Sequence, residues 1–333
     1  MNAGARLPVR HHSRLATAAV VESGWRLASG EPVTRERLDL SIAPALDADT
    51  ARRAIDYAQG FGEVHCVLGN RRGGPYDLRW LAAVPRLRTF LLMDEKFDAF
   101  DQLAALPPTL EALTVDGTRA KGWSLRALER WPALRELKLE GHSRDIEAVA
   151  SLRVLERLEL KSLTLPGLDF LAAAPRLWWL RVVLGGTHRL EALAKLARLE
   201  YLDLTRIRGV VDVEPVSALR NLQNLVLREL AQVRALPDLR GNARLRRLYV
   251  WQLKNLTDVH ALRAAPALEE YIHTHARTLQ PEDFAFLAGH PTLRRLLVGF
   301  GSKKKNAALE AWAEAQGLDT GAPPSFEYLP APA

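Results

Sequence analysis

The sequence contains very little sulfur: Cys66 is its single cysteine, and only two methionines occur among 333 residues. One thiol cannot form an internal disulfide, which excludes a fold closed by disulfide bonds within the chain. We therefore expect a reducing, cytoplasmic location.

Long apolar runs are also missing. Stretches such as 16–21 are far shorter than the roughly 20 residues that a membrane-spanning helix needs. Arginines and histidines occur near the start of the sequence, but neither a long apolar run nor a clear small-residue cleavage site follows them. We expect neither a membrane span nor a signal peptide.

Dense clusters of one charge are scarce. The chain has 46 lysines and arginines against 39 acids, for a net charge of +7, and its only dense basic run is Lys303–Lys305. A basic balance permits binding to RNA or another polyanion. Because the charges are dispersed and mixed, they give this interpretation little support.

Sequence motifs for catalysis, phosphate binding or metal binding are weak. The glycine pair at 73–74 and the pair at 185–186 do not form a phosphate-binding fingerprint, and no isolated acid/base pair stands out. His273 and His275 alternate on an expected strand and would share a face, but the sequence supplies no third metal ligand. Cys66 follows His65, but a small buried residue is the simpler interpretation. We expect no enzyme, no cofactor and no metal site.

Leucine is abundant and periodic. Ten stretches of the type LRELKL (134–139) begin at leucines that lie 21 to 25 residues apart. Counted from this first leucine, positions one, four and six are apolar in nearly every repeat and the intervening positions vary. Alternation from position three onward is typical of a strand with one buried face. The period predicts a repeat solenoid. The ten first leucines are Leu87, Leu110, Leu134, Leu155, Leu177, Leu199, Leu222, Leu245, Leu268 and Leu293.

A second apolar pair, spaced by three residues, follows each strand, for example Leu125/Leu128 and Leu236/Leu239. This spacing fits a turn of 3₁₀- or α-helix, which would return the chain to the next parallel strand. A side-chain oxygen often precedes the pair and would cap the helix. The expected capping residues are Asp77, Ser124, Asp145, Asp212, Asp258 and Asp283.

These repeats resemble the leucine-rich repeat superfamily over about residues 61–300, with ten clear units and one degenerate unit. The stretches VEPVSALRNL (213–222) and LTDVHAL (256–262) look like the internalin-type and related short-helix bacterial repeats. The resemblance implies an α/β horseshoe with a parallel concave sheet and short helices or 3₁₀ turns on the convex side.

The sequence departs from that family at one position. Three residues after position six the family normally has asparagine, whereas this chain has other residues there. We therefore expect the family's asparagine ladder to be missing or replaced. The residues at this position include Glu95, His142, Leu163, Gly185, Ile207, Leu230 and Leu253.

The segments on either side of the repeats are expected to cap the two ends of the array. Residues 1–60 are expected to form an N-terminal cap with strands at 18–27 and 37–42 and a helix at 48–59, before a degenerate strand at 63–68. Residues 301–333 are expected to form a C-terminal capping helix over 306–316, followed by a loose or irregularly packed proline-rich tail.

Outward positions three, five and seven fall into two zones. In the third and fourth repeats they pair opposite charges, such as Lys138 with Glu159, which favours a self-neutralised, solvated surface. The next zone is rich in aromatic residues and arginines, which are typical of binding hot spots. The alternative is that these side chains pack against loops. The predicted partner-binding residues are Trp179, Arg181, Tyr201, Arg228, Arg247, Tyr249 and Trp251.

The pattern favours a non-catalytic, monomeric scaffold that binds a protein partner on its concave face, for example as an inhibitor or immunity-type protein. The alternative from another class is an RNA- or polyanion-binding repeat protein that uses its arginine-rich surface.

Overall fold

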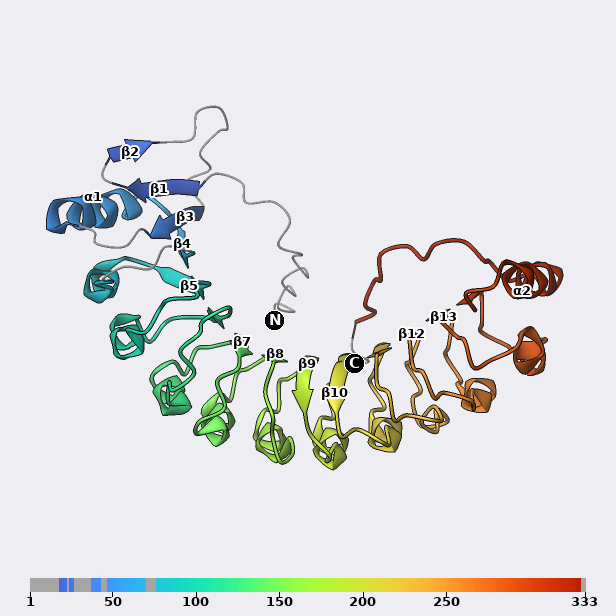
Figure 1. Ribbon diagram of the computed structural model, residues 1–333. Helices are drawn as coiled ribbons and strands as arrows, with labels where there is room; N and C mark the ends of the chain where they lie inside the picture. Colours follow the sequence, from blue (N-terminus) through green and yellow to red (C-terminus); the bar gives the residue numbers. More distant parts are fainter. Residues whose placement is uncertain (1–17, 23, 27–36, 43–46, 70–75, 331–333) are drawn as a thin grey trace.

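The protein is a leucine-rich repeat solenoid. The structure is a computed structural model that describes residues 18–22, 24–26, 37–42, 47–69 and 76–330. Figure 1 shows the repeats arranged in an open arc, with the strands along the inner, concave side and short helices along the outer, convex side. All strands belong to one 14-stranded sheet.

Nearly all strand pairs are parallel, and the exception is the pair β1–β2 at the N-terminal end. The strands are β1 (Ala18–Glu22), β2 (Gly24–Arg26), β3 (Arg37–Ile42), β4 (Glu63–Leu68), β5 (Leu87–Leu92), β6 (Ala112–Val115), β7 (Glu136–Glu140), β8 (Arg157–Lys161), β9 (Trp179–Gly186), β10 (Tyr201–Arg208), β11 (Asn224–Arg228), β12 (Arg247–Trp251), β13 (Glu270–Thr274) and β14 (Arg295–Gly299).

The expected register is confirmed. Leu137, Leu158, Leu180 and Leu202 pair in order across β7 to β10, and each is at most 2% exposed. Position four of each repeat therefore forms a continuous ladder inside the core. The register shifts once, between β4 and β5, where a β-bulge accommodates the degenerate first repeat.

The expected helical turns return the chain on the convex side. They are 3₁₀ helices: η1 (Arg79–Ala83), η2 (Phe100–Ala105), η3 (Leu125–Arg130), η4 (Ile146–Ser151), η5 (Asp169–Ala173), η6 (Glu191–Lys195), η7 (Glu214–Ala218), η8 (His260–Ala264) and η9 (Pro281–Leu287).

One repeat lacks this helix, so the expectation from Leu236/Leu239 is wrong in its local structure. Both leucines are buried, but the chain between β11 and β12 forms turns and an isolated bridge from Ala235 to Asp258 in place of a helix. Pro237 alone does not account for the difference, because η9 forms although it begins at a proline, Pro281.

Four of the six expected caps are confirmed. Asp77, Ser124, Asp212 and Asp258 each accept a hydrogen bond from the backbone N–H two residues later. Asp283 acts in the reverse direction, because its carboxylate accepts from the backbone N–H of Gln280.

Asp145 is not a cap. Its backbone is left-handed (φ 59°), and its carboxylate accepts a hydrogen bond from Ser124 of the preceding repeat. The prediction failed there because the side chain serves a neighbouring turn instead of its own helix.

In most repeats, the residue at position eight has a left-handed backbone conformation. Glycine meets this requirement at Gly117 and Gly141, with φ of 70° and 73°. The other repeats place residues with a Cβ there, at a cost of roughly 1–2 kcal/mol each. These residues are Ser162, Leu184, Arg206, Glu229, Gln252 and His275.

The family's asparagine position is filled in three ways. Leu163, Ile207, Leu230 and Leu253 are buried and extend the apolar core into the turn. His142 is fully buried and shares a 2.9 Å hydrogen bond with Thr118 of the preceding repeat. The remaining variants include Glu95, which is exposed, and Gly185, where a Cβ would lie only 2.0 Å from the Leu163 carbonyl oxygen.

Both ends carry a helix. Helix α1 (Ala48–Ala58) begins after an Asp47 cap and packs Ala54 and Ala58 into the core. Helix α2 (Lys303–Ala315) begins three residues earlier than expected, because the Ser302 side chain caps it. Strands β1, β2 and β3 occupy the expected N-terminal segments, except for Ser23 and Leu27, which lie outside the described residues.

Of the two expectations for the tail, irregular packing describes residues 322–330 and a loose tail does not. After Asp319 forms a bridge with Arg295 of β14, the chain turns back and crosses toward the middle of the array, as the red trace in Figure 1 shows. Backbone and aromatic contacts hold it against the repeats, and Gln223 bonds to Leu329 across 106 residues of sequence.

Candidate functional site: the concave aromatic–arginine zone

The seven predicted partner-binding residues lie on four adjacent strands, β9 to β12, and all are half-buried. We call this set the concave site. The alternation of inward and outward residues places every one of them outside the core. Its members are Trp179, Arg181, Tyr201, Arg228, Arg247, Tyr249 and Trp251.

An aromatic stack forms one half of the concave site. The rings of Trp179 and Tyr201 face each other at a centroid distance of 5.0 Å and an angle of 7°. The guanidinium of Arg157 covers Trp179 at 5.2 Å from its ring centroid. Such contacts contribute about 0.5–1.5 kcal/mol each, so these rings are fixed in place before any partner arrives.

The other half contains Arg228, Tyr249 and Trp251. The guanidinium of Arg228 lies 5.2 Å from the Tyr249 ring centroid. Trp251 donates a hydrogen bond of 3.0 Å from its indole N–H to Nδ1 of His275. Among the described residues, no carboxylate lies within ion-pair distance of Arg228, so its charge is available to a partner.

Arg181 is neutralised within the protein. It bonds to Asp203 at 3.1 Å and to Glu159 at 3.4 Å. Asp203 is only 1% exposed and also accepts a hydrogen bond from Thr205. Arg181 therefore supports the site more than it attracts a charged ligand.

Tyr201 stays protonated over the physiological range. Burial raises the pKa of its phenol above the ordinary value, and the negative charge of Asp203 adds to the rise. Its hydroxyl donates to Asp203 at 3.4 Å. The ring is thus an uncharged stacking surface.

The charge-paired zone next to the site is confirmed. Lys138 lies 3.3 Å from Glu159, Lys161 lies 3.3 Å from Glu140, and Arg157 lies 3.1 Å from Glu136.

The sequence interpretation missed Asp116, which joins these pairs into a network through Lys138 and Lys161 at 2.6 and 3.1 Å. Burial alone would raise the pKa of Asp116. Hydrogen bonding with Glu140 and with the two ammonium groups outweighs burial and lowers it.

The tail covers one side of the concave site. Arg247 donates to the carbonyl oxygen of Pro324 at 2.9 Å, and its guanidinium lies 5.0 Å from the Phe326 ring centroid. Tyr328 packs edge-on against Trp178, with 5.7 Å between the ring centroids. The tail therefore brings Phe326 and Tyr328, which are remote in sequence, to the predicted site. Their signal in the sequence was two aromatic residues within a proline-rich stretch.

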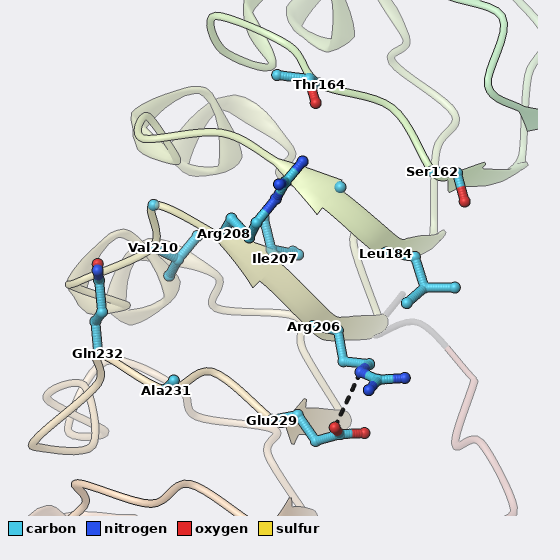
Figure 2. A pocket seen from close by; sticks show the side chains of 12 residues that line it. Ser162, Thr164, Leu184, Arg206, Ile207, Arg208, Val210, Glu229, Ala231 and Gln232 are labelled. Carbon is cyan, nitrogen blue, oxygen red and sulfur yellow. Dashed lines mark ion pairs between the residues drawn. The ribbon is translucent and has the colours of Figure 1, made fainter.

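A groove of about 750 Å³ lies at the opposite edge, where β8 to β11 end (Figure 2). Arg206 and Glu229 form an ion pair of 3.0 Å across it. Its walls mix apolar and polar groups without a set of convergent reactive side chains. Its lining includes Ser162, Thr164, Leu184, Arg206, Arg208 and Glu229.

The histidine pair does not share a face as the alternation predicted. His273 is fully buried in the core, whereas His275 is exposed and has left-handed backbone (φ 61°) after the strand ends. In the part of the chain that the structure describes, no group of three or more His, Cys, Asp or Glu side chains is placed to hold a metal.

Cys66 is fully buried in β4, and burial raises the pKa of its thiol above the ordinary value. A thiol held in this protonated form is a poor nucleophile. No helix in the described residues is both long enough and apolar enough to cross a membrane.

Comparison of the chain with protein-family models and with curated proteins gives no match. Among solved structures, the chain is similar to an internalin (InlF) of Listeria monocytogenes, with 16% identity, 87% of this chain and 81% of that chain covered, and a TM-score of 0.58. It is also similar to the protein chain of the TLR13–ssRNA13 complex, with 18% identity, 79% of this chain and 43% of that chain covered, and a TM-score of 0.54. The fold is that of leucine-rich repeat proteins, in the internalin-like form with short 3₁₀ turns.

Proposed function

We propose that the protein is a non-catalytic scaffold that binds a protein partner through the concave site. One observation carries the proposal: four large aromatic side chains occupy outward positions of β9, β10 and β12, within a run of four neighbouring strands, and nearby groups hold them in place. Rigid aromatic residues and arginine near the centre of a surface are typical of binding hot spots. These four residues are Trp179, Tyr201, Tyr249 and Trp251.

We also propose an inhibitory role, a cytoplasmic location and a monomeric state. An inhibitor or immunity-type protein that blocks its partner would use the same surface. The single buried thiol supports a reducing, cytoplasmic setting. A monomer is the form that leaves the concave face open to a partner.

The test is quantitative capture of partners from an extract of the source cells by the purified full chain. Trp179→Ala/Trp251→Ala should weaken binding about 30-fold or more, because the loss of even one of the best anchors costs about 2 kcal/mol.

Lys138→Ala/Glu159→Ala is the matched control on the same face. It should bind normally, because Asp116 keeps Lys161 and Arg181 keeps Asp203. Both variants must melt as the wild type does. Full affinity in the tryptophan variant would remove the concave site from the proposal.

RNA or another polyanion is the second candidate. It is favoured by arginines that lie over aromatic rings, Arg157 at Trp179 and Arg228 at Tyr249, because unstacked bases bind such surfaces. The similar TLR13 chain was solved with a single-stranded RNA. Binding that weakens steeply with salt would identify this class of ligand, whereas a shallow dependence supports a protein partner.

A further inference from the structure

The tail follows the edge of the sheet where the strands begin. Leu329 exchanges two hydrogen bonds with the Gln223 side chain, at 2.9 Å through its carbonyl and at 2.8 Å through its N–H. Arg246 donates to the carbonyl oxygen of Glu327 at 2.8 Å, and Arg244 donates to that of Pro330 at 2.6 Å. The protein thus binds the tail's backbone as it would bind an extended peptide.

Two aromatic side chains of the tail provide the remaining contacts. Phe326 lies beneath both Arg246 and Arg247, at 5.5 and 5.0 Å from ring centroid to guanidinium. Tyr328, one residue further along, packs against Trp178. Burial raises the pKa of the Tyr328 phenol, so the residue binds as a neutral group. We call the receiving surface the rim track. It consists of Trp178, Gln223, Arg244, Arg246 and Arg247.

The tail does not satisfy the rim track completely. Nη1 of Arg244 and Nε of Arg246 are buried without a hydrogen-bond partner. Among the described residues, no carboxylate lies within ion-pair distance of Arg244. Buried donors without partners are costly, so a ligand that offers a carboxylate here would bind better than the tail does.

Two features of the tail suit its replacement by another extended chain. It has no helix or strand beyond residue 320, and Leu329 leaves 47% of its surface exposed. Its hydrogen bonds join side chains of the repeats to backbone groups of the tail. Another extended chain has the same backbone groups and can accept the same bonds.

We propose that the rim track is a peptide-binding surface, which the chain's own tail occupies until an extended segment of a partner protein replaces it. The segment carries two aromatic residues separated by one residue, as Phe326 and Tyr328 are, and a carboxylate that reaches Arg244. This inference rests on the proposed function for the class of partner, and it adds a second surface that shares only Arg247 with the concave site.

The test uses the full chain with Phe326→Ala/Tyr328→Ala, which releases the tail from its aromatic contacts. The probe is a labelled peptide of residues 321–330 (GAPPSFEYLP), made once with a free C-terminal carboxylate and once amidated. The released variant should bind the peptide about tenfold or more tightly than the wild type, whose tethered tail competes at millimolar effective concentration. The free-carboxylate peptide should bind about threefold or more tightly than the amide. Arg244→Ala should abolish that difference.

Arg246→Ala in the released variant should weaken binding about tenfold, because a backbone hydrogen bond and a cation–π contact are lost. Arg135→Ala is its matched control: Arg135 holds the same position of its repeat and pairs with Glu156, but it lies outside the tail's path.

Three results would overturn the inference: no peptide binding by the released variant when its melting is unchanged, equal binding by the wild type, or equal losses in Arg246→Ala and Arg135→Ala. None of them affects the concave site, which the tryptophan variant tests separately.

Discussion

His273 is a single buried residue that makes the stability of the solenoid depend on pH. It occupies a core position that is leucine or valine in the other repeats, and none of its surface is exposed. Its Nδ1 shares a hydrogen bond of 2.9 Å with Tyr271, while its Nε2 has no partner. Burial lowers the pKa of His273 to about 4.

Stability should therefore fall in mild acid. The unfolded chain takes up this proton near pH 6.5, whereas the folded chain resists it until about pH 4, so stability is lost as the pH falls through that window. Between pH 7 and 4.5 this one histidine should cost about 2 kcal/mol. His273→Leu should reduce the pH dependence of the unfolding free energy by that amount. A pH dependence in His273→Leu equal to that of the wild type would contradict the assignment.

Core leucines should differ sharply from exposed ones. Leu180 is fully buried in a central repeat, and Leu180→Ala should cost about 2–5 kcal/mol through lost burial and a cavity. Leu329→Ala in the tail should cost far less, because half of that side chain already faces solvent and its backbone bonds remain. Denaturant midpoints measure both, and equal midpoints would refute the core register.

Position eight of most repeats, at or near the end of the strand, takes a left-handed backbone conformation. Gly117 takes a left-handed conformation there, and a Cβ added to it would meet no atom within 4 Å. Gly122, a few residues later, has equally open surroundings without the positive φ.

Gly117→Ala should therefore destabilise the protein by about 1–2 kcal/mol through backbone strain alone. Gly122→Ala should be neutral or slightly stabilising. Thermal or chemical unfolding of the two variants separates strain from crowding. If both variants lose the same stability, the turn does not impose the left-handed conformation.

At the scale of the whole molecule, the sequence predicts the repeats best. Each repeat shows the same apolar positions, so the errors of one unit are corrected by its neighbours, and the buried residues of position four pair in order from β7 to β10 as expected. The helix missing before β12 was not predicted, because the average pattern of the other units outweighed the local sequence of this one.

Contacts between distant segments could not be predicted in the same way. Alternation along β9 to β12 placed Trp179 and Tyr249 on the outward face, but nothing periodic connects Phe326 to Arg246 across the array. The tail belongs to no repeat, and only the folded arc brings it to the rim. The alternative that the outward side chains pack against loops holds for Arg247, which contacts Pro324 and Phe326 of the tail.

Site-specific photocrosslinking tests whether the outward face of β9 to β12 contacts the partner. A photoreactive phenylalanine analogue would replace Tyr249 in the full chain, with Lys138 on the charge-paired zone and Arg263 on the convex side as comparison positions. If the partner binds this face, the analogue at position 249 should give a protein adduct of one defined mass in extract of the source cells, and the other two positions should give none. Adding Trp179→Ala should abolish the adduct. Adducts from Lys138 or Arg263 with none from Tyr249 would contradict binding at this face.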